Sequence, residues 1–407
     1  MKLKERFSRH VSRLVGASTG ERILISFGAL VFSMLVGTML ILFAGVLAEC
    51  SRPAFRLFGV GFCYDPITIF DKLFLGAFGD PLSAGFHPLN GQMATTLAET
   101  TILIFAGVSV AIAFKAGIFN IGAQGQLIVG ALATAVVLLP IAPHVTGALG
   151  TLVLLIFGLF IGGLAGGAFA AIPGWLLAYL EANEVITTIM LNFVATSLAL
   201  YLVANHFKDP DSFANQTVSL PDHAQFPSLV FEPRDDFSII ALFVAILTLF
   251  AIWYLLEHTA LGFDIRTSGV QPRAAAYGGV NAERTILSAM TLSGALAGIG
   301  GAVYVLMVLG NFQVGVPSYG FDGITVSILA GNNPLGVGFA GLLFGVLKSG
   351  SVMVDVGTDV PPELVGVLRG LIILFVAMPE FFRMLGMRFG LDGGPPERTA
   401  EEVSADE

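Results

Sequence analysis

The chain has 407 residues, of which 55% are hydrophobic and only 12% are charged. Soluble domains carry roughly 25% charged residues, so this composition excludes a soluble protein and predicts a polytopic membrane protein. The formal net charge of −9 does not indicate nucleic-acid binding, because the acids gather in expected loops and in the C-terminal sequence EEVSADE.

The N-terminal segment 1–22 is basic, and the uncharged run 23–47 follows it. A membrane-crossing helix needs about 20 apolar residues, and basic flanks stay in the cytoplasm. We therefore expect a cytoplasmic N-terminus and an uncleaved first span. The next loop, 48–94, is expected outside, where Cys50 and Cys63 either form a disulfide or remain two thiols, and general priors favour the thiols.

Further apolar runs alternate with polar segments along the chain. Those expected to cross the membrane fully are 95–114, 121–139, 148–172, 185–204, 238–256, 285–309 and 364–378. Between them lie an external loop, 205–237, and a cytoplasmic loop, 257–284. Basic residues after the last span place the C-terminus in the cytoplasm, and the acidic tail 381–407 is expected to be disordered.

Residues 321–349 do not fit two full crossings at 1.5 Å per residue, and the sequence GNNP at 331–334 interrupts them. Because both termini are expected in the cytoplasm, this stretch must enter and leave the membrane from the same side. We therefore expect a broken, re-entrant pair of short helices. The predicted fold is an all-α transmembrane bundle over 23–380, with about eight full spans plus this pair.

Two interruptions rich in glycine and amides fall between apolar runs, KAGIFNIGAQGQ at 115–126 and GNNP at 331–334. Unwound backbone at membrane depth is tolerated where protein or a water-filled cavity satisfies it, and broken helices in two halves of a transporter mark a substrate path. The expected path residues are Glu99, Phe119, Asn120, Gln124, Gln126, Asn192, Asn332 and Asn333. Helix–helix hydrogen bonding is the alternative role for the polar ones.

Motifs for catalysis and metal binding are missing from the sequence. Leu347 stands where a Walker loop ending at Lys348-Ser349 would need glycine, and the histidines lack metal-ligand spacing. We expect no enzymatic activity, no metal and no cofactor. Ion-coupled secondary transport remains an alternative, although such transporters usually place paired charges deep in the bundle.

The cytoplasmic loop carries the pattern G-x-x-x-R-x-x-G-x-x-x-x-A-A-x-Y-x-G, followed by SGALAG in the next span. This pattern resembles the branched-chain amino acid and ribose-type permeases of ABC importers. Segments 96–132, 183–195 and 320–351 are similar to members assigned to nucleoside and simple-sugar uptake, although Gln124 stands where many relatives carry Glu. In that family the loop is a coupling helix that seats on the ATPase, and the matching residues are Gly262, Arg266, Gly269, Ala274, Ala275, Tyr277 and Gly279.

The resemblance implies a permease subunit in the cell membrane, with ATP hydrolysis in separate ABC ATPase subunits. A second homologous permease and an extracytoplasmic solute-binding lipoprotein would complete the importer, and loop 205–237 is the expected docking surface for the binding protein. A nucleoside or simple sugar suits the uncharged path better than an amino acid, whose charges call for a paired ion or helix termini. An amino acid permease stays the alternative within the family.

Overall fold

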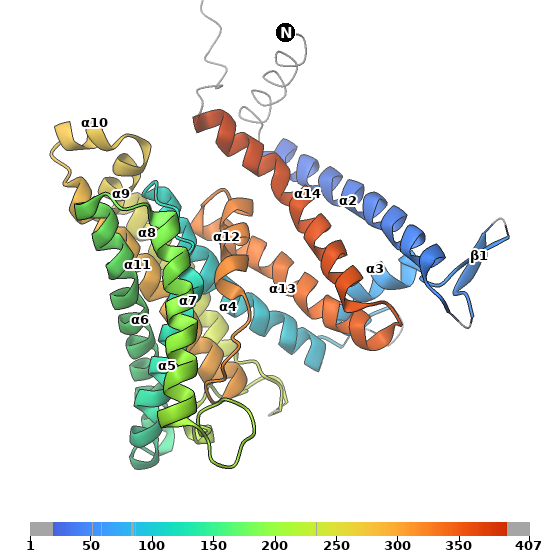
Figure 1. Ribbon diagram of the computed structural model, residues 1–407, viewed down its shortest axis with the longest axis horizontal. Helices are drawn as coiled ribbons and strands as arrows, with labels where there is room; N and C mark the ends of the chain where they lie inside the picture. The colour runs from blue at the N-terminus through green and yellow to red at the C-terminus, as the bar shows by residue number, and fades with distance from the viewer. Residues whose placement is uncertain are drawn as a thin grey trace, which may run out of the picture. The chain divides into compact units, whose positions relative to one another are not determined.

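The computed structural model describes residues 19–388 apart from 51, 58, 83, 84, 86 and 233, and it describes no side chains for 19–26, 272 and 379–388. Most of the predicted basic segment 1–22 and of the predicted tail 381–407 therefore lies outside the described residues. The described chain is helical almost throughout (Figure 1), which confirms the predicted all-α bundle. It divides into two compact units, 67–362 and a smaller one made of 1–66 with 363–407.

The smaller unit contains two helices, α2 (Thr19–Leu47) and most of α14 (Pro362–Arg388), and a hairpin of β1 (Phe55–Leu57) and β2 (Val60–Phe62). The strands are antiparallel, with Phe55 opposite Phe62 and their rings stacked at 5.0 Å between centroids. A disulfide joins Cys50 to Cys63 beside this hairpin. The sequence analysis favoured two free thiols, and the structure contradicts this prediction.

The larger unit carries the remaining elements. Its helices are α3 (Pro66–Phe74), α4 (Gly91–Lys115), α5 (Ala123–Ile141), α6 (Gly147–Leu180), α7 (Glu184–Leu202), α8 (Ile239–His258), α9 (Ala260–Val270), α10 (Pro272–Tyr277), α11 (Ala282–Val303), α12 (Tyr319–Leu329) and α13 (Pro334–Gly357). Short π-helical segments extend α7 and α11, namely η3 (Val203–Phe207) and η5 (Tyr304–Leu309). The 3-10 turns are η1 (Gly76–Phe78), η2 (Ala142–His144) and η4 (Asp222–Ala224).

Eight helices in the described part of the chain are long and apolar enough to cross a membrane. Seven of them overlap the predicted spans before residue 310, and the eighth is α13. The predicted break at 331–334 does separate α12 from α13, but α13 has 24 residues against 11 for α12. The prediction of two short helices is therefore right for α12 and wrong for α13, because α13 continues past residue 349 to Gly357 through residues that are small or apolar except for Asp355.

Glycines set the distance between α6 and α11, the helix pair with the most extensive contact in the unit. A Cβ atom on Gly298 would lie 2.1 Å from the carbonyl oxygen of Gly162, and one on Gly166 would lie 2.4 Å from that of Gly294. Both distances are shorter than van der Waals contact, so only glycine fits. The glycines spaced by four residues in α6 therefore form a close-packing stripe.

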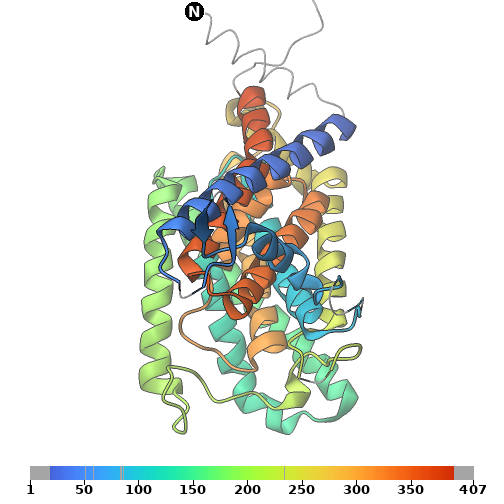
Figure 2. The same ribbon diagram turned by 90° about the vertical axis from the view of Figure 1, so that its right-hand side faces the viewer.

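The two long polar loops lie at opposite ends of the larger unit. The connection from α8 to α11, with α9 and α10, occupies the upper end in Figure 1. The segment between α7 and α8 crosses the lower end in Figure 2, from α7 on the left to α8 on the right. The two loops therefore lie on opposite sides of the bundle, and which of them is cytoplasmic stays a prediction.

Candidate functional site

The connection between α4 and α5, residues 116–122, returns into the bundle. At its start, the carbonyl of Lys115 lies against Gly269 of α9, at the end of the bundle. Five residues later, the side chain of Asn120 donates to Ser293 in the middle of α11 at 2.9 Å. Helix α5 therefore begins inside the bundle, as expected for a backbone break at membrane depth.

Asn120 has no hydrogen-bonding capacity left for a solute. Its amide nitrogen donates to Gln126 at 3.0 Å and to Ser293. Its carbonyl oxygen accepts from the backbone of Gly122 and from the amide of Gln126, at 3.0 and 3.1 Å. An asparagine amide offers two donors and two acceptor positions, and all four are used. Asn120 and Gln126 are each 1% exposed. In this structure both residues form hydrogen bonds within the protein, which is the alternative to a place in the solute path.

Asn192 supports the same break from α7. Its amide nitrogen donates to the carbonyl of Ile121, and its oxygen accepts from the backbone N–H of Gly125. The first N–H groups of a helix lack intrahelical partners, so Asn192 satisfies one of them in α5. Phe119, at the start of the same break, packs against Phe114 with ring centroids 5.2 Å apart.

Gln124 contacts an extended segment that the sequence interpretation left unassigned, residues 310–318, here named the wall segment. The amide nitrogen of Gln124 donates to the carbonyl of Pro317 at 2.9 Å. Its oxygen accepts from the backbone of Gly320 at 2.8 Å, at the start of α12. Gln124 thus joins the first turn of α5 to the end of the wall segment.

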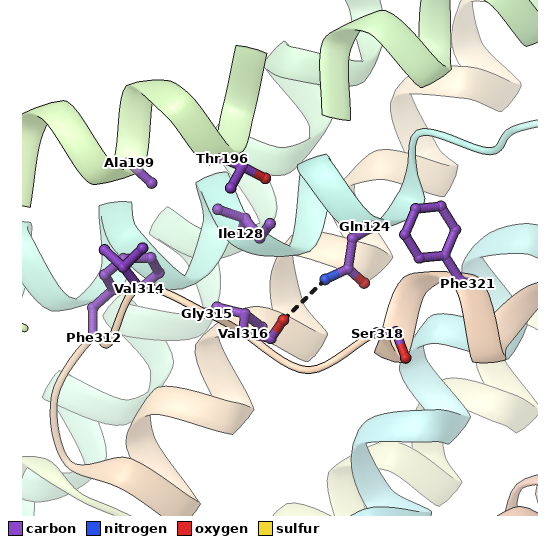
Figure 3. A pocket seen from close by; sticks show the side chains of 10 residues that line it. All are labelled: Gln124, Ile128, Thr196, Ala199, Phe312, Val314, Gly315, Val316, Ser318 and Phe321. Carbon is purple, nitrogen blue, oxygen red and sulfur yellow. Dashed lines mark hydrogen bonds between the residues drawn. The ribbon is translucent and has the colours of Figure 1, made fainter. Parts of the chain in front are cut away.

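A cavity of about 220 Å³ lies between the wall segment, α5 and α7. Figure 3 shows Phe321 beside Gln124 at one end and Phe312 at the other. The lining residues are Gln124, Ile128, Thr196, Ala199, Phe312, Val314, Gly315, Val316, Ser318 and Phe321. The lining carries no charged side chain, and Gln124 is the one predicted path residue within it.

The second predicted break, 331–334, serves as a turn between two helices. Asn332 adopts a left-handed conformation with φ of 56°, and its side-chain oxygen accepts from Ser327 at 2.9 Å. The side chain of Asn333 accepts from the backbone of Leu335 and caps α13. Neither asparagine is among the residues that line the cavity.

Glu99 belongs to an ion network on the other side of α12. Lys348 of α13 lies 3.2 Å from Glu99 and 3.2 Å from Asp322, and its ammonium is 3.9 Å from the ring centroid of Tyr319. The hydroxyl of Tyr319 donates to Glu99 at 2.9 Å. The three charged side chains are 14–28% exposed. The network holds the first turns of α12 against α4 and α13, outside the cavity lining.

The predicted coupling residues divide into a packed set and an exposed set. A Cβ atom on Gly262 would lie 2.1 Å from the carbonyl of Leu255, so this glycine packs α9 against α8. Arg266 pairs with Glu257 at 2.6 Å, and Ala275 is buried. The exposed set contains Ala274, Gly279 and Tyr277, the last with 96% of its surface exposed.

Sequence reasoning missed most of the cavity, including Thr196, Ser318, Phe312 and Phe321. One signal was present. Apolar residues alternate with polar ones or glycine from Asn311 to Val316, and a period of two predicts extended backbone. Six residues are too few to cross a membrane, so a search for apolar spans places this segment in a connection and assigns it no role.

The chain is similar to a known family over most of its length. Residues 92–377 match the family described as branched-chain amino acid transport system / permease component. A nucleoside ABC transporter permease protein of Lactococcus lactis subsp. cremoris is 33% identical over 88% of this chain and 91% of its own length. No solved structure matches significantly.

Two further relatives have different printed substrates. A guanosine ABC transporter permease protein of Bacillus subtilis is 32% identical over 79% of this chain and 88% of its own. A glucose ABC transporter permease protein of Haloferax volcanii is 31% identical, over 84% and 88% respectively.

These matches favour ATP-driven import over ion-coupled secondary transport, the two mechanisms that the sequence left open. Importers of this class keep ATP hydrolysis in separate subunits, so the chain is not itself an enzyme, and they work with ATPase and binding-protein partners. The eight apolar helices make it a multi-pass protein of the cell membrane. The chain belongs to the branched-chain amino acid transport permease family and is a membrane-spanning permease subunit of an ABC importer.

Proposed function

We propose that the chain forms part of the translocation path for a nucleoside. The observation that carries this proposal is the uncharged cavity in which the ring of Phe321, 43% exposed, lies beside Gln124 (Figure 3). Aromatic rings stack on nucleobases with about 1–3 kcal/mol per base, and the hydroxyl groups of Thr196 and Ser318 in the lining suit a sugar. The relatives named for nucleoside and guanosine support this choice.

A simple sugar is the second candidate, supported by the glucose relative of Haloferax volcanii. An amino acid fits less well, because its carboxylate and ammonium groups would enter a lining without a counter-charge. The ring of Phe321 separates the two leading candidates, since a nucleobase offers it a flat aromatic face and a simple sugar does not.

A second homologous permease would complete the path. The cavity of about 220 Å³ is smaller than the roughly 300–1,000 Å³ of typical ligand sites, so one chain supplies only part of the site. Two different nucleoside ABC transporter permease proteins of Lactococcus lactis are similar to this chain, at 33% and 29% identity. This pairing supports a heterodimer of related permeases.

The end of the unit that carries α9 and α10 would contact the ATPase. Val270 and Tyr277 are 85% and 96% exposed there, and no described residue covers them. The packed residues behind them, Gly262 and Gly269, connect this surface to α8 and to the last turn of α4. Movement of α10 would therefore reach the connection 116–122 and the first turn of α5.

The opposite end, loop 205–237, would receive the solute-binding lipoprotein. Phe213 is fully exposed in this loop. Glu232 and Arg234 form an exposed ion pair at 2.6 Å, and this hydrogen bond raises the pKa of Arg234. A loop that carries an exposed aromatic ring and six acidic residues suits a partner with a basic rim and an apolar pocket.

Uptake of radiolabelled guanosine, uridine and glucose by cells that express the whole importer tests the substrate class. We expect saturable uptake of the nucleosides, weakened by at least about tenfold in KM for Phe321→Ala through loss of stacking. Phe339→Ala is the matched control, because Phe339 is 81% exposed on α13 and lies outside the cavity. Glucose uptake with no nucleoside uptake would replace the proposal by the sugar candidate.

A further inference from the structure

The wall segment is firmly attached at its outer half to loop 205–237. Four hydrogen bonds join them: Thr217 exchanges two with Phe312, at 2.9 and 3.0 Å, Val314 donates to Asn215 at 3.0 Å, and Leu220 donates to Gly310 at 2.7 Å. Gln216 and Gln313 face each other as an antiparallel bridge between these bonds. Every one of the bonds involves backbone groups, and Thr217 is only 1% exposed.

The inner half of the wall segment is held differently. Between Val316 and the start of α12, its hydrogen bonds to the rest of the protein go to one side chain, Gln124. The amide nitrogen of Gln124 contacts the carbonyls of Pro317 and Val316 at 2.9 and 3.4 Å, the second drawn as a dashed line in Figure 3. Release of this one side chain would free the inner half, whereas the outer half would stay paired.

Gly315 stands between the two halves. Its φ of +103° belongs to the region that side chains rarely adopt, and a Cβ atom there would meet nothing within 4 Å. Packing therefore does not explain the glycine, and backbone freedom does. Pro317 and Ser318, beyond it, are exposed, and Val316 and Ser318 line the cavity.

We propose that residues 316–318 are a gate over the cavity, hinged at Gly315 and latched by Gln124. The outer half of the wall segment stays paired with loop 205–237, and the inner half moves when the hydrogen bonds from the amide of Gln124 break. Gln124 is a positioning residue in this arrangement, because its hydrogen-bonding groups hold the gate and contact no solute. The inference rests on the proposed function for its purpose, since a gate requires a solute path.

The gate also connects the two ends of the unit. Gln124 lies in the first turn of α5, directly after the connection 116–122 that packs against α9 through Gly269. A displacement of α9 would therefore reach the latch through a few residues of backbone. Loop 205–237 holds the far side of the hinge, so each end of the unit controls one half of the wall segment.

The reactivity of a cysteine in the gate tests this proposal without any solute or ATP. The chain has two cysteines, and both are in the disulfide, so Val316→Cys places one free thiol in it. The assembled importer in nanodiscs is treated with a charged methanethiosulfonate reagent. We expect Gln124→Met, of similar size but without the amide, to raise the modification rate at position 316 by at least about tenfold, which equals about 1.4 kcal/mol.

Gln313→Cys in the outer half is the matched control, and its rate should be unaffected by Gln124→Met. If Gln124→Met fails to assemble, Gln124→Glu replaces it. This variant keeps an acceptor for Gly320 in α12 but loses the donor to the carbonyls of Val316 and Pro317, so an increase of similar size is expected at position 316. Equal rates at position 316 with and without the latch would overturn the proposal, as would equal increases at both positions. Nucleoside uptake by the unmodified importer separately tests the proposed function.

Discussion

The carbonyl oxygen of Lys115 would lie 2.0 Å from a Cβ atom on Gly269. Helix α9 therefore touches the last turn of α4 backbone to backbone, at the point where the chain turns back into the bundle. Gly117 lies on the same contact with φ of +74° and a Cβ position 3.1 Å from the carbonyl oxygen of Gly269. Because α10 packs against α9, this contact links the exposed α10 to the connection that begins α5.

Gly269→Ala should separate α9 from α4 and weaken coupling. A methyl group has no room 2.0 Å from a carbonyl oxygen, and overpacking typically costs about 1–3 kcal/mol. We expect solute uptake to fall at least about tenfold while the ATPase subunits still hydrolyse ATP. Gly370→Ala on α14 is the control, because nothing lies within 4 Å of its Cβ position. Equal uptake by the two variants would mean that the contact between Gly269 and Lys115 does not contribute to coupling.

Asn120→Leu should destabilise the protein without changing the affinity of the remaining active fraction. The substitution leaves the backbone N–H of Gly122 and the side-chain amide of Gln126 without their partner, while Ser293 keeps its bond to Ser109. Each unsatisfied buried group costs about 1–3 kcal/mol. Thermal unfolding in detergent should show a lower midpoint, with KM for uptake unchanged. Asn205→Leu is the control, since this exposed residue makes one bond to Tyr201. A changed KM at normal stability would restore Asn120 to the solute path.

The sequence predicted the helical bundle and the first backbone break, because each depends on a local pattern. It did not predict which amides face the cavity. Asn120 and Gln124 lie four residues apart in one motif, yet Asn120 bonds only within the protein and Gln124 lines the cavity. Their roles are set by Ser293 and Pro317, residues more than a hundred positions away, and no local pattern contains that information.

The ion network was missed for a related reason. Glu99, Asp322 and Lys348 come from three helices, and only the fold brings them within 3.2 Å. Gly269 shows the opposite case. The family motif identified it as a coupling residue, and the structure gives a physical reason, since it packs against Lys115 instead of projecting toward a partner.

Lys348→Met should loosen α12, because it leaves Glu99 and Asp322 close together without a cation. Breaking a buried ion pair costs about 3–5 kcal/mol, and we expect about 1–3 kcal/mol here because solvent reaches these groups. Lys348→Arg should retain most of the stability. Thermal unfolding of the two variants measures the difference, and identical midpoints for methionine and arginine would remove the network from the account.

The disulfide between Cys50 and Cys63 predicts that neither cysteine reacts with an alkylating reagent in the denatured, unreduced protein. Mass spectrometry should find two added groups after reduction and none before it. Serine at both positions should lower the stability of the smaller unit by about 2–4 kcal/mol. Two added groups without reduction would mean that the cysteines are thiols in the cell.

The central claim is that the surface of α9 and α10 faces the ATPase in the cytoplasm, with loop 205–237 on the outside. Single-cysteine variants Tyr277→Cys and Phe213→Cys, at residues that are almost fully exposed, are labelled with a membrane-impermeant maleimide in right-side-out and inverted vesicles. The account predicts labelling of position 277 only in inverted vesicles and of position 213 only in right-side-out ones. Labelling of position 277 from the outside would contradict it, because the motor could not then reach α10.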